Sequence, residues 1–230
     1  MKSFVRLVVV LAALVCVLGT SAEATIVDFV STDAAVEFNI GTNSMTIRLT
    51  NTGTVSAIAN TLTGVVFTFS VTPPAETLTG ASAAGTATCT GMGSATSCST
   101  NATPVSASGS SPFGWTLAVS GSTDALQAGG GSFKPDGIVN STIVASGKDG
   151  LGNANHNPYL LGPVTFTKTF GTPAPANLTV TAVTFDFGTD PATETAHLAP
   201  APEASTMFLG GTGVILLGYA ARKRFLPRSA

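Results

Sequence analysis

Apolar and polar residues alternate with a period of two along much of this chain. Residues 34–40 (AAVEFNI) and 44–51 (SMTIRLTN) alternate throughout, and Met45, Ile47 and Leu49 share one face of the second segment. This is the period of a β-strand with one buried face. The same pattern predicts strands over residues 64–71, 113–120, 163–170 and 177–188. In the last of these the parity changes at Ala182-Val183, which predicts a β-bulge.

The large aromatic residues lie in phase with the apolar faces of these segments. We therefore predict a core between two sheets that contains Phe67, Phe69, Trp115, Phe166, Phe185 and Phe187. Gly, Pro, Asn and Asp separate the segments, and helix-forming stretches are scarce after residue 25. Short strands with such punctuation predict an all-β domain, an antiparallel β-sandwich of jelly-roll or immunoglobulin-like connectivity. Residues 81–111 consist mostly of Ala, Ser, Thr and Gly, and we interpret them as a long surface loop.

The N-terminus has the three parts of a secretory signal peptide. Lys2 and Arg6 precede an apolar run at residues 7–18, and Ala22 and Ala24 occupy the −3 and −1 positions of a cleavage site. Residues 1–24 are therefore predicted to be a signal helix that signal peptidase removes after Ala24. A buried N-terminal helix is the alternative. A lipoprotein signal is rejected because the residue before Cys16 is not small.

The C-terminus has a second three-part pattern at residues 201–225. Pro202, Glu203, Ala204 and Ser205 precede an uncharged stretch, residues 207–221, and Arg222, Lys223 and Arg224 follow it. As a helix the uncharged stretch would be about 22 Å long, against a hydrocarbon core of about 30 Å, so it predicts a marginal transmembrane helix. The basic cluster would stay in the cytoplasm by the positive-inside rule, which leaves the body of the chain outside.

This order of parts resembles the PEP-CTERM sorting signal of Gram-negative bacteria. The resemblance implies recognition and cutting by an exosortase, a membrane protease, and transient residence in the inner membrane. Ala204 stands where the family has a second Pro, which leaves the cleavage position open. Residues 133–167 and 180–189 also resemble blocks of secreted proteins of this kind. Two alternatives remain: an anchor that is never processed, and a glycosylphosphatidylinositol signal, which usually lacks a basic end.

Removal of both ends leaves a secreted domain at residues 25–200 with low charge. It keeps Arg48, Lys134, Lys148 and Lys168 against ten carboxylates, a net charge of −6. Nucleic-acid binding is therefore not expected. Loss of Cys16 with the signal peptide leaves Cys89 and Cys98, which should form a disulfide in an oxidising compartment. A reactive or metal-binding pair is the alternative, but it lacks His or further Cys nearby.

No catalytic motif is present, so no enzyme activity and no cofactor are predicted. The G-x-S-x-G and H-E-x-x-H patterns are missing from the sequence. The Gly-rich stretch around Asp136, Asp149, Asn153 and Asn155 offers oxygen ligands for calcium. However, Leu151 occupies the third position of an EF-hand spacing, and turn-forming Asn and Asp residues explain the same pattern. No metal site is therefore predicted.

Two functions fit these observations. The first is an exported, non-enzymatic protein of the cell envelope or extracellular matrix, with extracellular polysaccharide as a candidate partner. The second is a secreted carbohydrate-binding module or hydrolase on a β-sandwich. The second requires an exposed aromatic platform, for which Trp115, Tyr159 and Tyr219 are the candidates.

Overall fold

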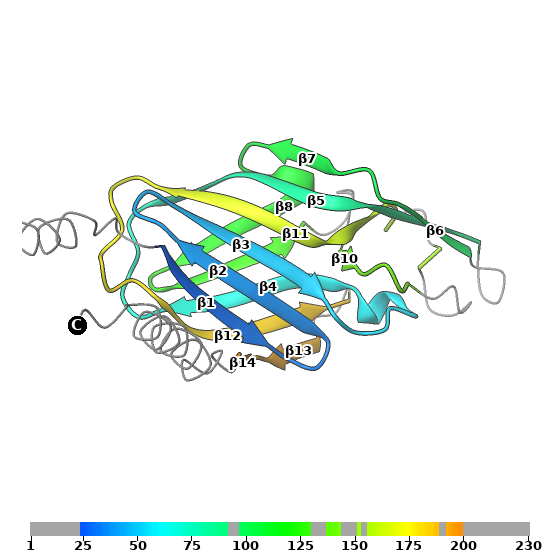
Figure 1. The fold of residues 1–230 in the computed structure, drawn as a ribbon, viewed down its shortest axis with the longest axis horizontal. Coiled ribbons are helices and arrows are strands. Elements are labelled where there is room, and N and C mark those ends of the chain that lie inside the picture. The colour runs from blue at the N-terminus through cyan, green and yellow to red at the C-terminus, as the bar shows by residue number, and fades with distance from the viewer. Residues whose placement is uncertain are drawn as a thin grey trace, which may run out of the picture. The chain divides into compact units, whose positions relative to one another are not determined.

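The computed structural model describes residues 24–91, 97–129, 137–143, 151–152, 156–188 and 192–199. Residues up to His197 form one unit, and residues 198–230 form a second, of which only Leu198 and Ala199 are described. The described part is all-β, as the alternation predicted. It contains a large mixed, β-sandwich-like sheet whose strands are drawn in Figure 1. The predicted signal helix and the C-terminal segment lie outside the described residues.

The elements are as follows. The strands are β1 (Thr25–Val30), β2 (Ala34–Ile40), β3 (Ser44–Asn51), β4 (Leu62–Phe69), β5 (Glu76–Thr90), β6 (Ser97–Asn101), β7 (Val105–Ser108), β8 (Trp115–Ser120), β9 (Thr123–Ala128), β10 (Ile138–Val139), β11 (Tyr159–Phe170), β12 (Val180–Phe187), β13 (Ala192–Thr195) and β14 (His197–Leu198). Two 3-10 helices are described, η1 (Ile58–Asn60) and η3 (Pro112–Gly114). No helix within the described ranges is long and apolar enough to cross a bilayer.

The strands form two layers. Layer 1 runs β1-β2-β3-β11-β5, and β5 also pairs with β6 and β7. Layer 2 runs β13-β12-β4-β9-β8. In Figure 1, β2, β3, β11 and β5 cross in front of β4, β8 and β12. The short strand β10 links the layers, because it pairs with β4 on one side and with β11 on the other.

The pairing of β10 with β11 corrects the prediction of a purely antiparallel sheet. It is parallel, with Ile138 opposite Leu160, whereas every other described pairing with a recorded register is antiparallel. The chain leaves β10 and returns at β11 in the same direction after a long connection. A parallel pair requires such a crossover, while antiparallel strands can be joined by a tight turn.

The predicted core is confirmed. Phe67, Phe69, Trp115, Phe166, Phe185 and Phe187 are all buried. The Phe38 and Phe67 rings, from β2 and β4, lie 5.0 Å apart between centroids, and those of Trp115 and Phe166, from β8 and β11, lie 4.9 Å apart. These contacts join the two layers, since each ring pair takes one member from each. Aromatic pairs at this spacing stabilise a core beyond the area they bury.

The predicted strands match the observed ones most closely near the N-terminus. β2 and β3 have the predicted bounds, and β4, β11 and β12 differ from prediction by a few residues at their ends. β12 has a register shift against β4 between Val180 and Ala182, just before the position Ala182-Val183 where a bulge was predicted. The prediction for residues 113–120 is partly wrong. The alternation there places Phe113, Trp115, Leu117 and Val119 on one face, but Phe113 lies in η3 with φ of 55° and Val119 is 50% exposed.

The interpretation of residues 81–111 as a surface loop is wrong. They contain most of the long strand β5, together with β6 and β7, which both pair with it. Ala81, Ala83, Ala87 and Cys89 are buried at strand spacing, so small side chains supply the apolar face. Small residues also allow close approach: a Cβ at Gly85 would lie 2.0 Å from the backbone oxygen of Asn101. Low complexity here therefore reflects tight strand packing.

Candidate functional site

Three charged side chains meet in the core between the layers. Lys168 is on β11, Glu76 is the first residue of β5, and Asp124 is the second residue of β9. None of the three side chains has exposed surface. Buried ionisable groups with a specific charged partner are the usual marks of a functional site, although they also occur in structural ion pairs. We call these three residues the buried triad.

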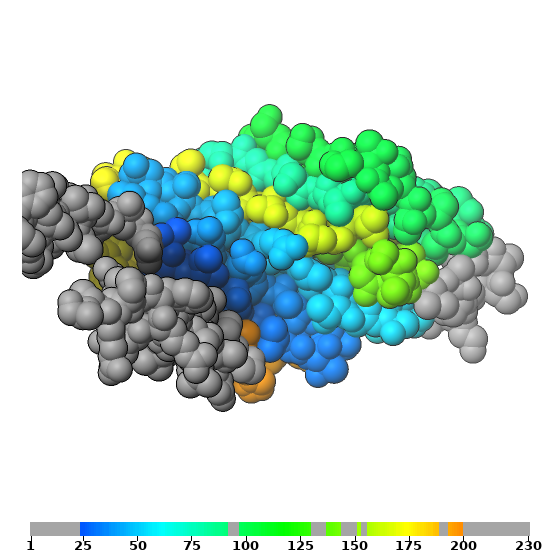
Figure 2. Space-filling view, viewed as in Figure 1, coloured from blue at the N-terminus to red at the C-terminus, as the bar shows by residue number. Residues whose placement is uncertain are grey.

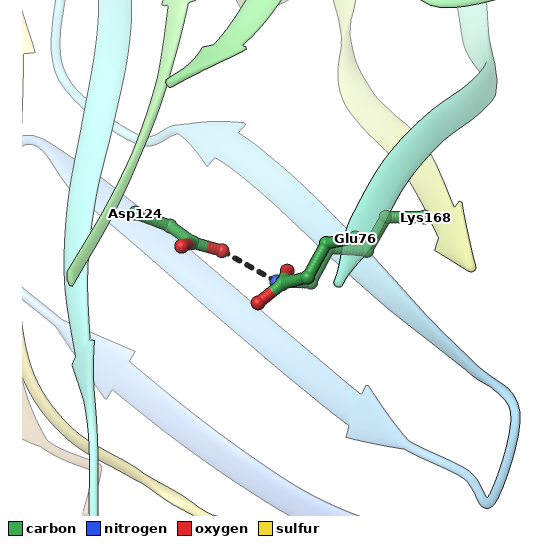
Figure 3. Close-up of polar contacts among 3 residues, drawn as sticks. All are labelled: Glu76, Asp124 and Lys168. Carbon is green, nitrogen blue, oxygen red and sulfur yellow. Dashed lines mark hydrogen bonds and ion pairs between the residues drawn. The ribbon is translucent and has the colours of Figure 1, made fainter. Parts of the chain in front are cut away.

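The strand register brings the triad together. β5 and β11 are neighbours, with Lys168 opposite Leu78 and Glu76 opposite Phe170. Glu76 and Lys168 therefore come from adjacent strands of layer 1. Asp124 lies opposite Phe67 in layer 2, where β9 pairs with β4. Figure 3 shows the Lys168 side chain passing beside Glu76 toward the Asp124 carboxylate.

The contacts within the triad are direct. Lys168 Nζ donates a hydrogen bond to Asp124 Oδ2 at 2.6 Å, drawn as a dashed line in Figure 3. It donates a second hydrogen bond to Glu76 Oε2. The other oxygen of each carboxylate, Glu76 Oε1 and Asp124 Oδ1, is buried without a hydrogen-bond partner. In each carboxyl group, one oxygen thus accepts a hydrogen bond from Lys168, and the other is buried without a hydrogen-bond partner.

Aromatic rings form the walls around the lysine. Nζ lies 4.5 Å from the Phe69 ring centroid, 5.1 Å from that of Phe67 and 5.7 Å from that of Phe170. These rings attract a cation through their negative faces. They also replace water around Nζ, and in Figure 2 the neighbouring strands of layer 1 form a continuous outer surface. The triad is therefore a dry polar site inside an apolar core.

The triad carries one carboxylate more than its cation can neutralise. Burial raises the pKa of Glu76 from its usual 4.5 to about 7, because the charged form is desolvated. The positive charge of Lys168 opposes this rise in pKa, and the negative charge of Asp124 adds to it. At neutral pH a large fraction of Glu76 is therefore a neutral acid. With Glu76 protonated, the ammonium and the Asp124 carboxylate leave the triad without net charge.

This arrangement combines three chemical functions within direct contact. It has the Lys168 amine and two carboxyl groups that the amine contacts, those of Asp124 and Glu76. The Glu76 carboxyl group can hold or release a proton near neutrality. An amine beside a carboxyl group is a nucleophile next to an acyl carbon, once the amine loses its proton. A proton-transfer group with a pKa near the working pH is the most effective kind.

None of the three triad residues was predicted to form a site, although the sequence contains a signal for two of them. In the segment 163–170, Lys168 is in phase with Phe166 and Phe170, at a position that should face the core. Asp124 is likewise in phase with Leu126, and both are buried. A charged residue in the apolar phase of a strand predicts either an exposed strand or a buried partner. Only the pairing of distant strands identifies that partner.

The predicted disulfide is present. Cys89 and Cys98 lie opposite each other on β5 and β6, and their sulfur atoms are bonded. Cys89 belongs to a second buried cluster, whose members are Val55, Ala87, Cys89, Val139, Leu151, Tyr159 and Leu161. The Asn157 side chain ties this cluster together, since it accepts from the Cys89 N–H at 2.6 Å and donates to the Leu151 carbonyl at 2.8 Å.

Most of the remaining predicted positions lie outside the described residues. Ala24 is exposed just before β1, while Ala22, the Pro202–Ser205 motif and the basic cluster at residues 222–224 lie outside the described residues. So do Asp136, Asp149, Asn153 and Asn155. Within the part of the chain that is described, no group of three His, Cys, Asp or Glu residues could hold a metal ion. Trp115 and Tyr159 are both fully buried.

No protein-family model, no curated protein and no solved structure matches the chain significantly.

Proposed function

We propose that this chain is an exported protein of the cell envelope or extracellular space, with a structural and not an enzymatic role. In this proposal residues 1–24 direct export and residues 201–225 hold the chain in the inner membrane until an exosortase-like protease cuts it. Residues 25–200 then form a secreted β-sandwich of jelly-roll or immunoglobulin-like type. Extracellular polysaccharide is the proposed surrounding matrix.

The Cys89–Cys98 bond is the structural observation that carries the proposal. Disulfides persist in oxidising compartments and are rare in the cytoplasm of ordinary cells. The bond joins the only two cysteines that remain after the predicted signal cleavage. Export also suits the low charge of the body and its many Ser and Thr residues.

The alternative, a carbohydrate-binding module or hydrolase, needs aromatic rings on the surface to stack against sugars. Trp115 and Tyr159, the two candidates within the described residues, are fully buried. Neither can serve as a platform in this fold. The observation favours the structural role.

The test is the C-terminal sequence of the protein recovered outside the cell. We expect the released form to end at about Ser205, because the proposed protease would act at the Pro202–Ser205 motif. A released form that still ends at Ala230 would contradict sorting and leave the segment as a plain anchor. Detection of the full chain in the cytoplasm with its N-terminal Met retained would contradict export as well.

A further inference from the structure

Burial of the triad destabilises the fold, and a purely structural domain has no need of buried charges. Burying charged groups requires their desolvation, and replacing a buried ion pair with apolar residues often stabilises a protein. Here the cost is greater, because two buried carboxylate oxygens have no hydrogen-bond partner. We propose that the triad is a covalent cross-linking site, in which Lys168 and Asp124 condense spontaneously to an intramolecular amide bond with Glu76 transferring protons.

The two reacting groups are already in contact through a hydrogen bond. Lys168 Nζ is 2.6 Å from Asp124 Oδ2, so the acyl carbon Cγ is the next atom beyond the contact. Three rings confine Nζ, and the strand register holds both backbones. Reactive groups that are held in such geometry react far faster than the same groups in solution, because the entropy of bringing them together is already lost.

The protons and atoms of the reaction balance without any other reagent. The ammonium of Lys168 first gives one proton to the Asp124 carboxylate, which leaves a neutral amine beside a carboxylic acid. The amine nitrogen attacks Cγ, and the C–N bond forms as the Cγ–O bond to the hydroxyl group breaks. The hydroxyl leaves as water after taking a proton. One ammonium and one carboxylate thus become one amide and one water.

Glu76 is placed to carry the protons of these steps. Its Oε2 accepts a hydrogen bond from Nζ, so it touches the atom that must lose protons. Its pKa of about 7 allows it to give a proton to the leaving hydroxyl and to recover one from the nitrogen. Glu76 therefore begins and ends the reaction in the same state, as a catalyst must.

The surroundings favour the amide product. An amide is neutral, so condensation removes the buried cation and one buried anion from the core. The remaining Asp124 oxygen becomes an amide carbonyl that a protonated Glu76 can satisfy. The rings of Phe67, Phe69 and Phe170 keep water away from the bond, which protects it from hydrolysis. The product joins β11 of layer 1 to β9 of layer 2, across 44 residues of sequence.

Mass spectrometry of the purified, disulfide-reduced full chain tests the proposal. We expect the measured intact mass to be lower, by the mass of one water molecule, than the mass calculated from the sequence between the determined termini. Trypsin needs a free lysine side chain, so it should leave the peptide bond after Lys168 uncut and release residues 49–148 joined to the segment that begins at residue 149. A folded protein with the unmodified mass and normal cleavage after Lys168 would overturn the proposal.

Substitutions separate the roles of the residues. Asp124→Asn should lose one ammonia where the wild type loses one water, and Asp124→Ala should lose neither. Glu76→Gln keeps the size of the side chain but cannot exchange protons, so bond formation should slow by about 100-fold or more. Glu37→Gln is the matched control on an exposed ion pair with Arg48, and it should cross-link like the wild type.

Folding of each variant is followed by circular dichroism, so that a missing bond is interpreted only in a folded chain. Wild-type behaviour in a folded Glu76→Gln variant would overturn the catalytic part of the proposal. The wild-type mass alone decides whether the bond forms, and it does so independently of any variant. It is also independent of export, since condensation needs no oxidising compartment, processing enzyme or membrane.

Discussion

Glu76 makes stability depend on pH in a defined direction. Its pKa is about 7 in the folded protein and about 4.5 when exposed, so between these values the folded state binds more protons than the unfolded state. The contribution of Glu76 to the free energy of unfolding should therefore be largest below about pH 4.5 and be lost as pH rises to about 7. Burial is the main cause of the raised pKa, so the sign holds whether or not Lys168 is bonded to Asp124.

Urea denaturation at a series of pH values measures this effect. Replacing Glu76 by Gln should flatten the fall in unfolding free energy between pH 5 and pH 7. Glu37→Gln, at a half-exposed carboxylate, should leave the fall in place. The same dependence of unfolding free energy on pH in the wild type and in Glu76→Gln would show that the pKa of Glu76 is not raised by folding.

Phe69 contributes to stability through packing. It is 3% exposed, and its ring contacts that of Phe67 at 5.5 Å between centroids. Phe69→Ala should lower the free energy of unfolding by about 3–5 kcal/mol, because it leaves a cavity in the core. Val119→Ala, at a side chain that is 50% exposed, should change it by no more than about 0.5 kcal/mol. Equal effects of the two substitutions in denaturant titrations would contradict this assignment of the core.

At the scale of elements, the disulfide joins two paired strands near the end of β5. Closing a loop of about ten residues should stabilise the fold by about 2–3 kcal/mol through the unfolded state. Replacing Cys89 and Cys98 by Ser should thus lower the melting temperature without abolishing the fold, since the aromatic core is made by other strands. Two alkylated thiols in the purified, unreduced protein, seen by peptide mass spectrometry, would contradict the bond.

The long strand β5 is the element that organises layer 1 around the triad. It pairs with β11 along most of its length, and β6 and β7 cover its other edge. Its Ala and Gly residues keep neighbouring backbones close, as the contact at Gly85 shows. The disulfide joins β5 to β6. The proposed amide would join β11, the neighbour of β5, to β9 of layer 2.

At the scale of the whole molecule, the proposed localisation depends on the two terminal segments. If Arg222, Lys223 and Arg224 hold the C-terminus in the cytoplasm, neutral substitutions at all three should prevent processing, because the basic cluster fixes the orientation of the apolar segment. Cell fractionation and C-terminal sequencing measure this outcome. Neutral substitutions at Lys134 and Lys148 in the body are the control and should leave processing unchanged. Normal release of the tail variant would show that charge does not direct sorting.

The sequence by itself determined the all-β class, the aromatic core and the disulfide partners. Alternation with a period of two is a local property, because each residue's face follows from its own strand, and it identified β2 and β3 to the residue. It also placed the six core aromatics correctly. The cysteine pairing followed from a count of two. None of these predictions depends on which strands are neighbours in the sheet.

Only the tertiary structure decided what residues 81–111 do and which charges meet. Residues 81–90 became part of β5 because β11, β6 and β7 pair with that strand. Small side chains give too weak a periodic signal to predict this pairing. Lys168 is 92 residues from Glu76 and 44 from Asp124. Their contact depends on the register of β5 against β11 and on the packing of β9 beneath them. Such long-range pairings are set by the burial of the whole core, so no local pattern could specify the triad.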